Sequence, residues 1–467
     1  MGRLKKLLSN TAILGAGTFI SKMLVFFLMP LYTACLSSDE FGVADILMQT
    51  ANLIIPLAVL GIADGLFRFT IDANPNNRKQ IFTFSVIIMF VGMVPLALLI
   101  QFFRLFSIYD GYVWLVFFYI CAANLHLIVA NYVRGCDKTK IFAAQGIVNT
   151  ALVIIFNIIF LVVLDMGVLG YLLSVVLADF LVSIGLILVC KLYKDITVKG
   201  VDRTLMRELL RFSIPYIPLT LMWTITGVSD RFVIIAVLGE NATSINGLYA
   251  AAYKLPTLIT IAGGIFMKAW HISSVSESDE KERADFFANV YKNYLCLMFA
   301  GGACLVAFSK LFTRILLNES YYESWKYVPV LAVAMIFSAF TEFLGSVYFV
   351  HKRSKRSLAT AAVGAITNIT LNFALIPFFG AMGAAIATAI CYMLVFLIRL
   401  IDTQKFIHFN RSIAKTTVNT ILLTAQVTLM IIDPPYWWIY QIGFVGFAMV
   451  FNCREILRSV LKLLKKQ

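Results

Sequence analysis

The chain has 467 residues, of which 60% are hydrophobic and only 14% are charged, with a net charge of +14 and a mean hydropathy of +0.87. A soluble domain of this length needs far more polar surface to face water, so the composition excludes an ordinary soluble protein. Apolar stretches of about 20 residues recur along the chain and are long enough to cross a ~30 Å hydrocarbon core as helices. Because they do not alternate apolar and polar residues, they are not strands of a membrane β-barrel.

These stretches predict an all-α polytopic membrane protein with about fourteen transmembrane helices. In chain order, the helices are expected near residues 11–35, 40–69, 81–103, 112–134, 141–164, 168–192, 209–238, 246–270, 286–309, 326–350, 356–378, 381–402, 411–432 and 436–460. The segments between them are short. The longest on one side is 310–325, and the longest on the other is the polar, basic segment before the seventh helix.

The basic residues cluster on one side of the membrane in this arrangement. Alternate connections hold nearly all of them, and the opposite connections hold only Arg104, Lys310, Arg314 and Lys326. The positive-inside rule therefore predicts that both termini are cytoplasmic. The same bias accounts for the net charge of +14 without a nucleic-acid partner.

The two halves of the sequence resemble each other. A glycine turn at 166–170, between the fifth and sixth helices, is matched by a turn at 380–383 between the eleventh and twelfth. We therefore expect two pseudo-symmetric six-helix lobes, 1–192 and 209–403, joined by a cytoplasmic linker, 193–208, and followed by helices 13 and 14 in 404–467. Repeats of this kind are typical of transporters that rock one lobe against the other.

Several short motifs carry a resemblance to a known family. They include Leu31-Tyr32-Thr33, Glu40-Phe41-Gly42, Asp230-Arg231-Phe232, the run from Gly247 to Lys254, the run from Asn372 to Pro377, and the turn from Gly380 to Ala385. Together they resemble the polysaccharide flippases of the O-antigen (Wzx) type, in the superfamily that also holds MATE drug transporters and the lipid II flippase. The resemblance spans nearly the whole chain. It implies a central cavity between two lobes and a cargo carried on a polyprenyl pyrophosphate.

Charged and polar residues inside the predicted helices are candidates for the cargo site, since a charge in the bilayer needs a partner or a wet cavity. The predicted substrate-binding set comes from helices 1, 2, 7 and 8, and comprises Lys22, Asp45, Gln49, Asn52, Asp230, Arg231, Tyr249, Tyr253 and Lys254. Lys22, Arg231 and Lys254 supply the positive charge that a pyrophosphate needs. Asp230 and Arg231 are neighbours in sequence, so we expect that they cannot pair on one helix face.

Two further carboxylates, Asp179 in the sixth predicted helix and Glu342 in the tenth, are candidate ion-coupling residues. Each is either a proton or cation site or a buried tie between helices. Asn149, Asn157, Asn368 and Asn372 fit helix packing.

The second predicted helix carries further signals. Gly61 and Gly65 form a small-xxx-small pair that favours close approach of a neighbouring helix. Asp64 and Arg68 are spaced for an i,i+4 ion pair. Pro56 in this helix has counterparts in Pro30, Pro218 and Pro256 of helices 1, 7 and 8, where kinks serve either bending or a static shape.

The resemblance implies a flippase that moves a polyprenyl-pyrophosphate-linked oligosaccharide from the inner to the outer leaflet by alternating access, for cell-surface polysaccharide biosynthesis. Expected partners are the cargo, membrane lipid and the polysaccharide assembly machinery, in a bacterial inner membrane. The alternatives are an ion-coupled MATE-type drug antiporter, a lipid II flippase and, more distantly, a membrane sugar polymerase. No P-loop or metal-ligand spacing is present, so we expect neither an enzyme nor a cofactor.

Overall fold

The computed structural model describes residues 23, 26–197, 202–273, 280–351 and 353–464. Throughout this part of the chain the regular structure is helical, which confirms the all-α fold. Within these described ranges, eleven helices are long and apolar enough to cross a membrane, or twelve if the bent pair Gly239–Lys254 and Thr257–Met267 forms one span. The first of the fourteen expected helices, near 11–35, includes residues that lie outside this description.

The chain divides into two compact units, Met1–Val228 and Ser229–Gln467. The division falls inside helix α10 (Ile217–Val237), beyond the linker expected at 193–208. The last two helices belong to the second unit. The six-helix lobes expected from the sequence stay a prediction.

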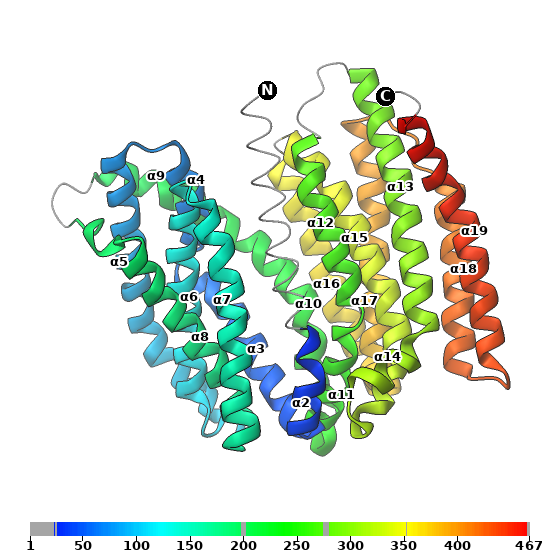
Figure 1. Cartoon of the computed structure of the whole chain (residues 1–467), viewed down its shortest axis with the longest axis horizontal. Helices are drawn as coiled ribbons and strands as arrows, with labels where there is room; N and C mark the ends of the chain where they lie inside the picture. The colour runs from blue at the N-terminus through cyan, green and yellow to red at the C-terminus, as the bar shows by residue number, and fades with distance from the viewer. Residues whose placement is uncertain (1–22, 24–25, 198–201, 274–279, 352, 465–467) are drawn as a thin grey trace. The chain divides into compact units, whose positions relative to one another are not determined.

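The first unit is built around helices α6 (Val113–Gly135) and α8 (Gly167–Val189), which pack against each other. Around them lie α2 (Met29–Cys35), α3 (Ser38–Ala58), α4 (Ile62–Asp72), α5 (Pro75–Leu99), α7 (Thr139–Asn157) and α9 (Arg203–Ser213) (Figure 1). Helix α7 continues as a π-helical turn, Ile158–Val163, before the chain enters α8. The three helices α6, α7 and α8 are in mutual contact, and this packing positions the polar cluster described below.

The second predicted helix, 40–69, is wrong as a single element. It begins at a capping box in which the Ser37 hydroxyl accepts from the Glu40 backbone and the Glu40 carboxylate accepts from the Ser37 backbone. It then breaks after α3, because Leu60 and Gly61 adopt left-handed backbone angles, with φ of 51° and 63°. Pro56 lies one turn before this break. Only after Gly61 does α4 begin, so Pro56 marks an interruption rather than a gentle kink.

The close approach expected at Gly61 and Gly65 is confirmed. A Cβ atom on Gly61 would lie 2.9 Å from Ile217 Cγ1, and one on Gly65 would meet the side chains of Ser213 and Leu209. A larger residue at Gly65 would therefore separate α4 from α9, and one at Gly61 would clash with Ile217 at the start of α10. The partner helix α9 begins at Arg203, inside the segment that the sequence suggested as a polar linker.

In the second unit, α15 (Val328–Val350) is the most buried span and packs against α17 (Ala381–Asp402). The other helices are α11 (Ala242–Lys254), α12 (Thr257–Ser273), α13 (Glu280–Ala307), α14 (Ser309–Leu316), α16 (Ser354–Phe379), α18 (Ile413–Ile432) and α19 (Trp437–Leu464). Figure 1 shows α13, α18 and α19 side by side, and the three are in contact. The expected loop at 310–325 is instead helical, as α14 and a 3-10 segment, Glu319–Lys326.

Helices α18 and α19 are joined by pairs of buried amides. The Gln426 side chain donates to Gln441 Oε1 at 3.0 Å, and the Gln441 side chain donates to the Gln426 carbonyl at 3.2 Å. A second amide pair joins the same two helices, in which Asn452 donates to Asn419 Oδ1 at 2.8 Å. Each amide in apolar surroundings thus finds its partner on the other helix.

Candidate functional site

Helix α3 presents the polar stripe that the i, i+4, i+7 spacing predicted. Gln49 Nε2 donates to Asp45 Oδ1 at 3.1 Å, and Asn52 Nδ2 donates to Gln49 Oε1 at 3.3 Å. Asp45 is buried, whereas Gln49 and Asn52 are half-buried. The three side chains therefore form one hydrogen-bonded row along a single helix face.

Asp230 and Arg231 on α10 form a fully buried ion pair, which corrects the expectation that neighbouring residues on a helix cannot pair. Arg231 Nη1 lies 3.1 Å from Asp230 Oδ1, and the two side chains are 5% and 0% exposed. The arginine is long enough to fold back along the helix and reach the adjacent carboxylate. Tyr249 donates its hydroxyl to Asp230 Oδ2 at 2.6 Å, so both carboxylate oxygens have a donor.

Aromatic rings of α11 enclose this ion pair. The Arg231 guanidinium carbon lies 4.5 Å from the centre of the Tyr253 ring and 5.7 Å from that of Tyr249. Cation–π contacts of this kind stabilise a guanidinium that is removed from water. The structure thus brings four of the predicted site residues together in one unit.

Lys254 ends α11 and is half-buried, one residue beyond Tyr253. Its carbonyl accepts from the Thr257 hydroxyl at 2.5 Å, across the bend at Pro256 that separates α11 from α12. Lys22 lies outside the described residues. The binding role of the whole predicted set stays a prediction.

A second polar cluster lies at mid-helix in the first unit. Asp179 on α8 accepts from His126 Nδ1 and from Asn149 Nδ2, both at 2.8 Å and both through Oδ1. On the other side of the imidazole, His126 Nε2 lies 2.7 Å from Gln145 Oε1. The side chains of His126 and Asp179 are 17% and 13% exposed. Sequence reasoning singled out Asp179 and missed His126 and Gln145, because their partners lie on other helices.

The other carboxylate, Glu342, stands in a different environment. It is exposed on α15, while its neighbours Thr341 and Phe343 are buried. The Tyr294 hydroxyl of α13 lies within range of the Glu342 charge.

Sequence reasoning also missed Arg399, a buried cation near the end of α17. Its guanidinium donates to the Thr360 hydroxyl at 2.9 Å and to the Thr341 carbonyl at 2.9 Å, and it is 2% exposed. Gly345 on α15 leaves room for the guanidinium, because a Cβ there would lie 2.6 Å from Arg399 Nη1. This contact joins two helices and leaves no signal in the local sequence.

Three of the four predicted packing asparagines have that role. Asn368 and Asn372 on α16 hydrogen-bond to Ser229 on α10, and Asn368 also donates to Thr388 on α17 at 3.2 Å. Asn157 likewise donates to the Tyr32 hydroxyl at 3.1 Å. Asn149 is the exception, because it belongs to the Asp179 cluster.

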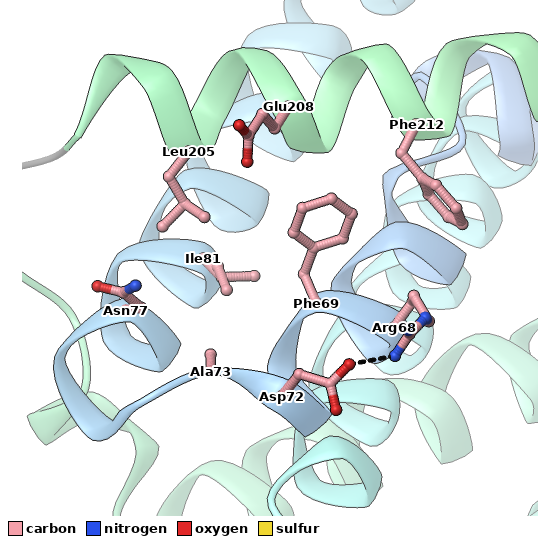
Figure 2. A pocket seen from close by; sticks show the side chains of 9 residues that line it. All are labelled: Arg68, Phe69, Asp72, Ala73, Asn77, Ile81, Leu205, Glu208 and Phe212. Atoms are coloured by element: carbon pink, nitrogen blue, oxygen red, sulfur yellow. Dashed lines mark hydrogen bonds and ion pairs between the residues drawn. The ribbon is translucent and has the colours of Figure 1, made fainter.

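A pocket of about 460 Å³ opens between α4, α5 and α9 (Figure 2). Its rim holds an ion pair between Arg68 and Asp72 at 2.5 Å, with both side chains largely exposed. Arg68 therefore pairs with Asp72, and the side chain of Asp64, its expected partner, lies outside the description. Glu208 faces the pocket from α9, above the apolar side chains of Leu205 and Ile81.

Family models match most of the chain. One described as polysaccharide biosynthesis protein matches residues 7–270, and one described as lipid II flippase MurJ matches residues 271–442. An uncharacterized membrane protein of Methanocaldococcus jannaschii is 24% identical over an alignment of 384 residues, which covers 78% of this chain and 89% of that protein. A second membrane protein of the same organism is 20% identical over 503 residues, covering 95% of this chain and 96% of that protein.

Solved structures share the fold. A lipid II flippase MurJ in an inward closed conformation matches with a TM-score of 0.72 and 14% identity, over 96% of this chain and 100% of that chain. An inward-facing MATE-family multidrug transporter of the MOP superfamily matches with a TM-score of 0.67 and 15% identity, over 82% of this chain and 95% of that chain. Since the polysaccharide model alone covers more than half of the sequence, the chain is a multi-pass membrane protein that belongs to the polysaccharide biosynthesis protein family, with the fold of the flippases and transporters of the MOP superfamily.

Proposed function

We propose that the protein is a flippase that carries a polyprenyl-pyrophosphate-linked oligosaccharide from the inner to the outer leaflet by alternating access. The observation that carries the proposal is the match of residues 7–270 to the polysaccharide biosynthesis model. The protein would act in an inner membrane with both termini in the cytoplasm, as the basic connections favour. It would receive its cargo from, and deliver it to, the machinery that assembles surface polysaccharide.

The pyrophosphate would be recognised by cations of α10 and α11. The Arg231 guanidinium pairs with Asp230 through Nη1 at 3.1 Å. A pyrophosphate carries several charged oxygens, which the positive charge of the guanidinium would attract. Lys254, one turn from the Tyr249–Arg231 contact, adds a second positive charge, and Lys22 of the first helix would add a third.

The sugar would be held by hydrogen-bonding side chains of α3. The row of Asp45, Gln49 and Asn52 on α3 offers both acceptors and donors along one helix face. Sugar hydroxyls need partners of both kinds, and tolerance of different sugars needs side chains that can exchange partners. This row supports a role in cargo contact without fixing the identity of the sugar.

Movement of the cargo would be driven by an ion gradient, because the sequence offers no nucleotide-binding motif. Asp179 and Glu342 are the proposed coupling residues, since each is a carboxylate within a span. Cargo movement in vesicles should survive ATP depletion while ion gradients are held, and stop when the gradients are collapsed. Transport unaffected by Asp179→Asn with Glu342→Gln would refute this assignment.

One specific observation favours a second candidate. The lipid II flippase model matches residues 271–442, so lipid II is an alternative cargo of the same chemical class. The discriminating experiment deletes the gene and identifies the lipid-linked sugar that accumulates on the inner leaflet. Accumulation of an oligosaccharide precursor is expected. Accumulation of lipid II instead would replace the cargo, and loss of drug efflux with no lipid-linked sugar retained would favour a MATE-type antiporter.

A further inference from the structure

The cluster around Asp179 joins three helices of one compact unit. His126 comes from α6, Gln145 and Asn149 come from α7, and Asp179 comes from α8. All four residues lie in the interior of their helices, and these helices are long and apolar enough to span a membrane. The bilayer supplies no water to substitute for a lost hydrogen bond at this depth. The protonation state of the cluster is therefore set by the side chains that face one another.

Those side chains accommodate a charged imidazole. Both ring nitrogens of His126 face oxygen atoms, Asp179 Oδ1 at 2.8 Å and Gln145 Oε1 at 2.7 Å. A neutral imidazole has one N–H and one lone pair, so only the imidazolium donates to both oxygens at once. Asp179 Oδ1 also receives the Asn149 amide at 2.8 Å, which suits a carboxylate anion.

The surroundings of the ring contain one acidic partner. From α8 the facing group is Asp179, from α7 the facing groups are the neutral amides of Gln145 and Asn149, and on α6 itself Tyr119 lies close enough to interact with the Asp179 charge. Among the described residues of α3, α4 and α5, no side chain makes an ion pair or hydrogen bond with the ring. With one proton bound, the cluster is an ion pair of zero net charge.

Loss of that proton would change the packing of the three helices. Neutral His126 would leave a carboxylate without its cation at membrane depth, which is costly. It would also leave a ring lone pair facing Gln145 Oε1, so the Gln145 amide would have to turn over and present its N–H group to the ring. Proton binding is thereby linked to the contacts between α6, α7 and α8.

We propose that His126 and Asp179 form a proton-binding dyad, and that a proton carried on His126 is the ion that drives transport. The second part rests on the proposed function. The first part concerns the dyad alone and holds for any cargo. Asp179 holds the imidazolium in place, Gln145 fixes the outer nitrogen, and Asn149 fixes the carboxylate.

The dyad is tested on the purified full-length chain in lipid nanodiscs. The sequence contains four histidines, so replacing His271, His351 and His408 by glutamine leaves His126 as the single imidazole. Its ¹⁵N resonances distinguish the imidazolium from either neutral tautomer. The imidazolium is expected at neutral pH, and in the same background Asp179→Asn should lower the ratio of imidazolium to neutral imidazole about tenfold at a given pH, since one nearby charge shifts such an equilibrium by about one pH unit.

Gln145→Met is the matched second variant, because it removes the acceptor at Nε2 and leaves the Asp179 contact. It should lower the imidazolium fraction less than Asp179→Asn does. A neutral His126 at neutral and mildly acidic pH, or an imidazolium fraction unmoved by Asp179→Asn, would overturn the dyad.

Transport by proteoliposomes under an imposed pH gradient tests the driving role. The triple-glutamine chain should respond to the gradient, and the same chain with His126→Gln should lose that response while any passive exchange of cargo remains. A dyad that titrates in a protein without flippase activity would refute the proposed function and leave the dyad standing. Gradient-driven flipping that persists with His126→Gln would refute the proton carrier and leave the proposed function standing.

Discussion

Two buried carboxylates, one in each unit, are neutralised by different bases. Asp230 pairs with Arg231 and accepts from Tyr249, and it is completely buried. Asp179 pairs with His126 and accepts from Asn149, and 13% of its side chain is exposed. An arginine stays charged at any physiological pH, whereas a histidine gains or loses its proton near neutrality. The first pair is therefore a permanent anchor, and the second can change its charge.

The largest loss of stability is expected when the cation of the Asp230–Arg231 pair, the anchor, is removed. Arg231→Gln would leave the Asp230 carboxylate buried without a cation and should lower the free energy of unfolding by about 3–5 kcal/mol. Unfolding of the purified protein in lipid nanodiscs would measure the loss. Addition of Asp230→Asn should restore much of it, because the orphaned charge is then removed. A stable Arg231→Gln protein would show that the pair is not an anchor.

Lys254, close to this anchor, is expected to affect transport rather than folding. Lys254→Gln should reduce export per folded molecule by roughly ten- to hundredfold, equivalent to about 1.5–3 kcal/mol for one charge-assisted contact. Lys254→Arg is the matched control and should retain most of the activity, as a wet cavity requires charge more than shape. The anionic-cargo hypothesis fails if the triple variant Lys22→Gln, Arg231→Gln, Lys254→Gln exports normally per folded molecule.

The switchable pair should tolerate loss of its carboxylate much better than the anchor tolerates loss of its cation. In Asp179→Asn, the histidine can release its proton and the new amide can still hydrogen-bond, so the stability cost should be about 1 kcal/mol. The same unfolding assay provides the comparison with Arg231→Gln. Equal costs at the two sites would mean that both pairs are structural.

The smallest effect is expected at the rim of the pocket in Figure 2, where Arg68 and Asp72 pair at the surface. Their side chains are 59% and 67% exposed, so water already solvates both charges. Arg68→Gln should cost about 0.2–1 kcal/mol. A larger loss would indicate that the charge of Arg68 has another partner and would weaken the contrast between exposed and buried pairs.

Sequence reasoning reached the features that depend on local periodicity. The spans of α6, α8, α15 and α17 follow their apolar runs closely, and the spacing of Asp45, Gln49 and Asn52 predicted one polar face. The glycine pair of α4 also predicted a close neighbour. Each of these properties is encoded within one helix.

Features that depend on contacts between helices, or on single backbone angles, could not be predicted from the sequence. The break of the second predicted helix rests on the left-handed angle of Leu60, a residue with no preference for it. The His126 cluster assembles residues that are 19 and 53 positions apart in the chain. The Asp230–Arg231 pair depends on a side-chain rotamer rather than on helical spacing.

The paired amides of α18 and α19 have a consequence for biogenesis. A lone glutamine or asparagine opposes the entry of a single helix into lipid, whereas a hairpin that satisfies its own amides can leave the translocon as a unit. We expect the last two helices to insert together and only then to dock on α13, where Gln426 also donates to the Ala303 carbonyl at 2.9 Å. Glycosylation mapping of nascent chains that end before or after α19 would show whether α18 enters the membrane only when α19 is present. Stable insertion of α18 alone would contradict it.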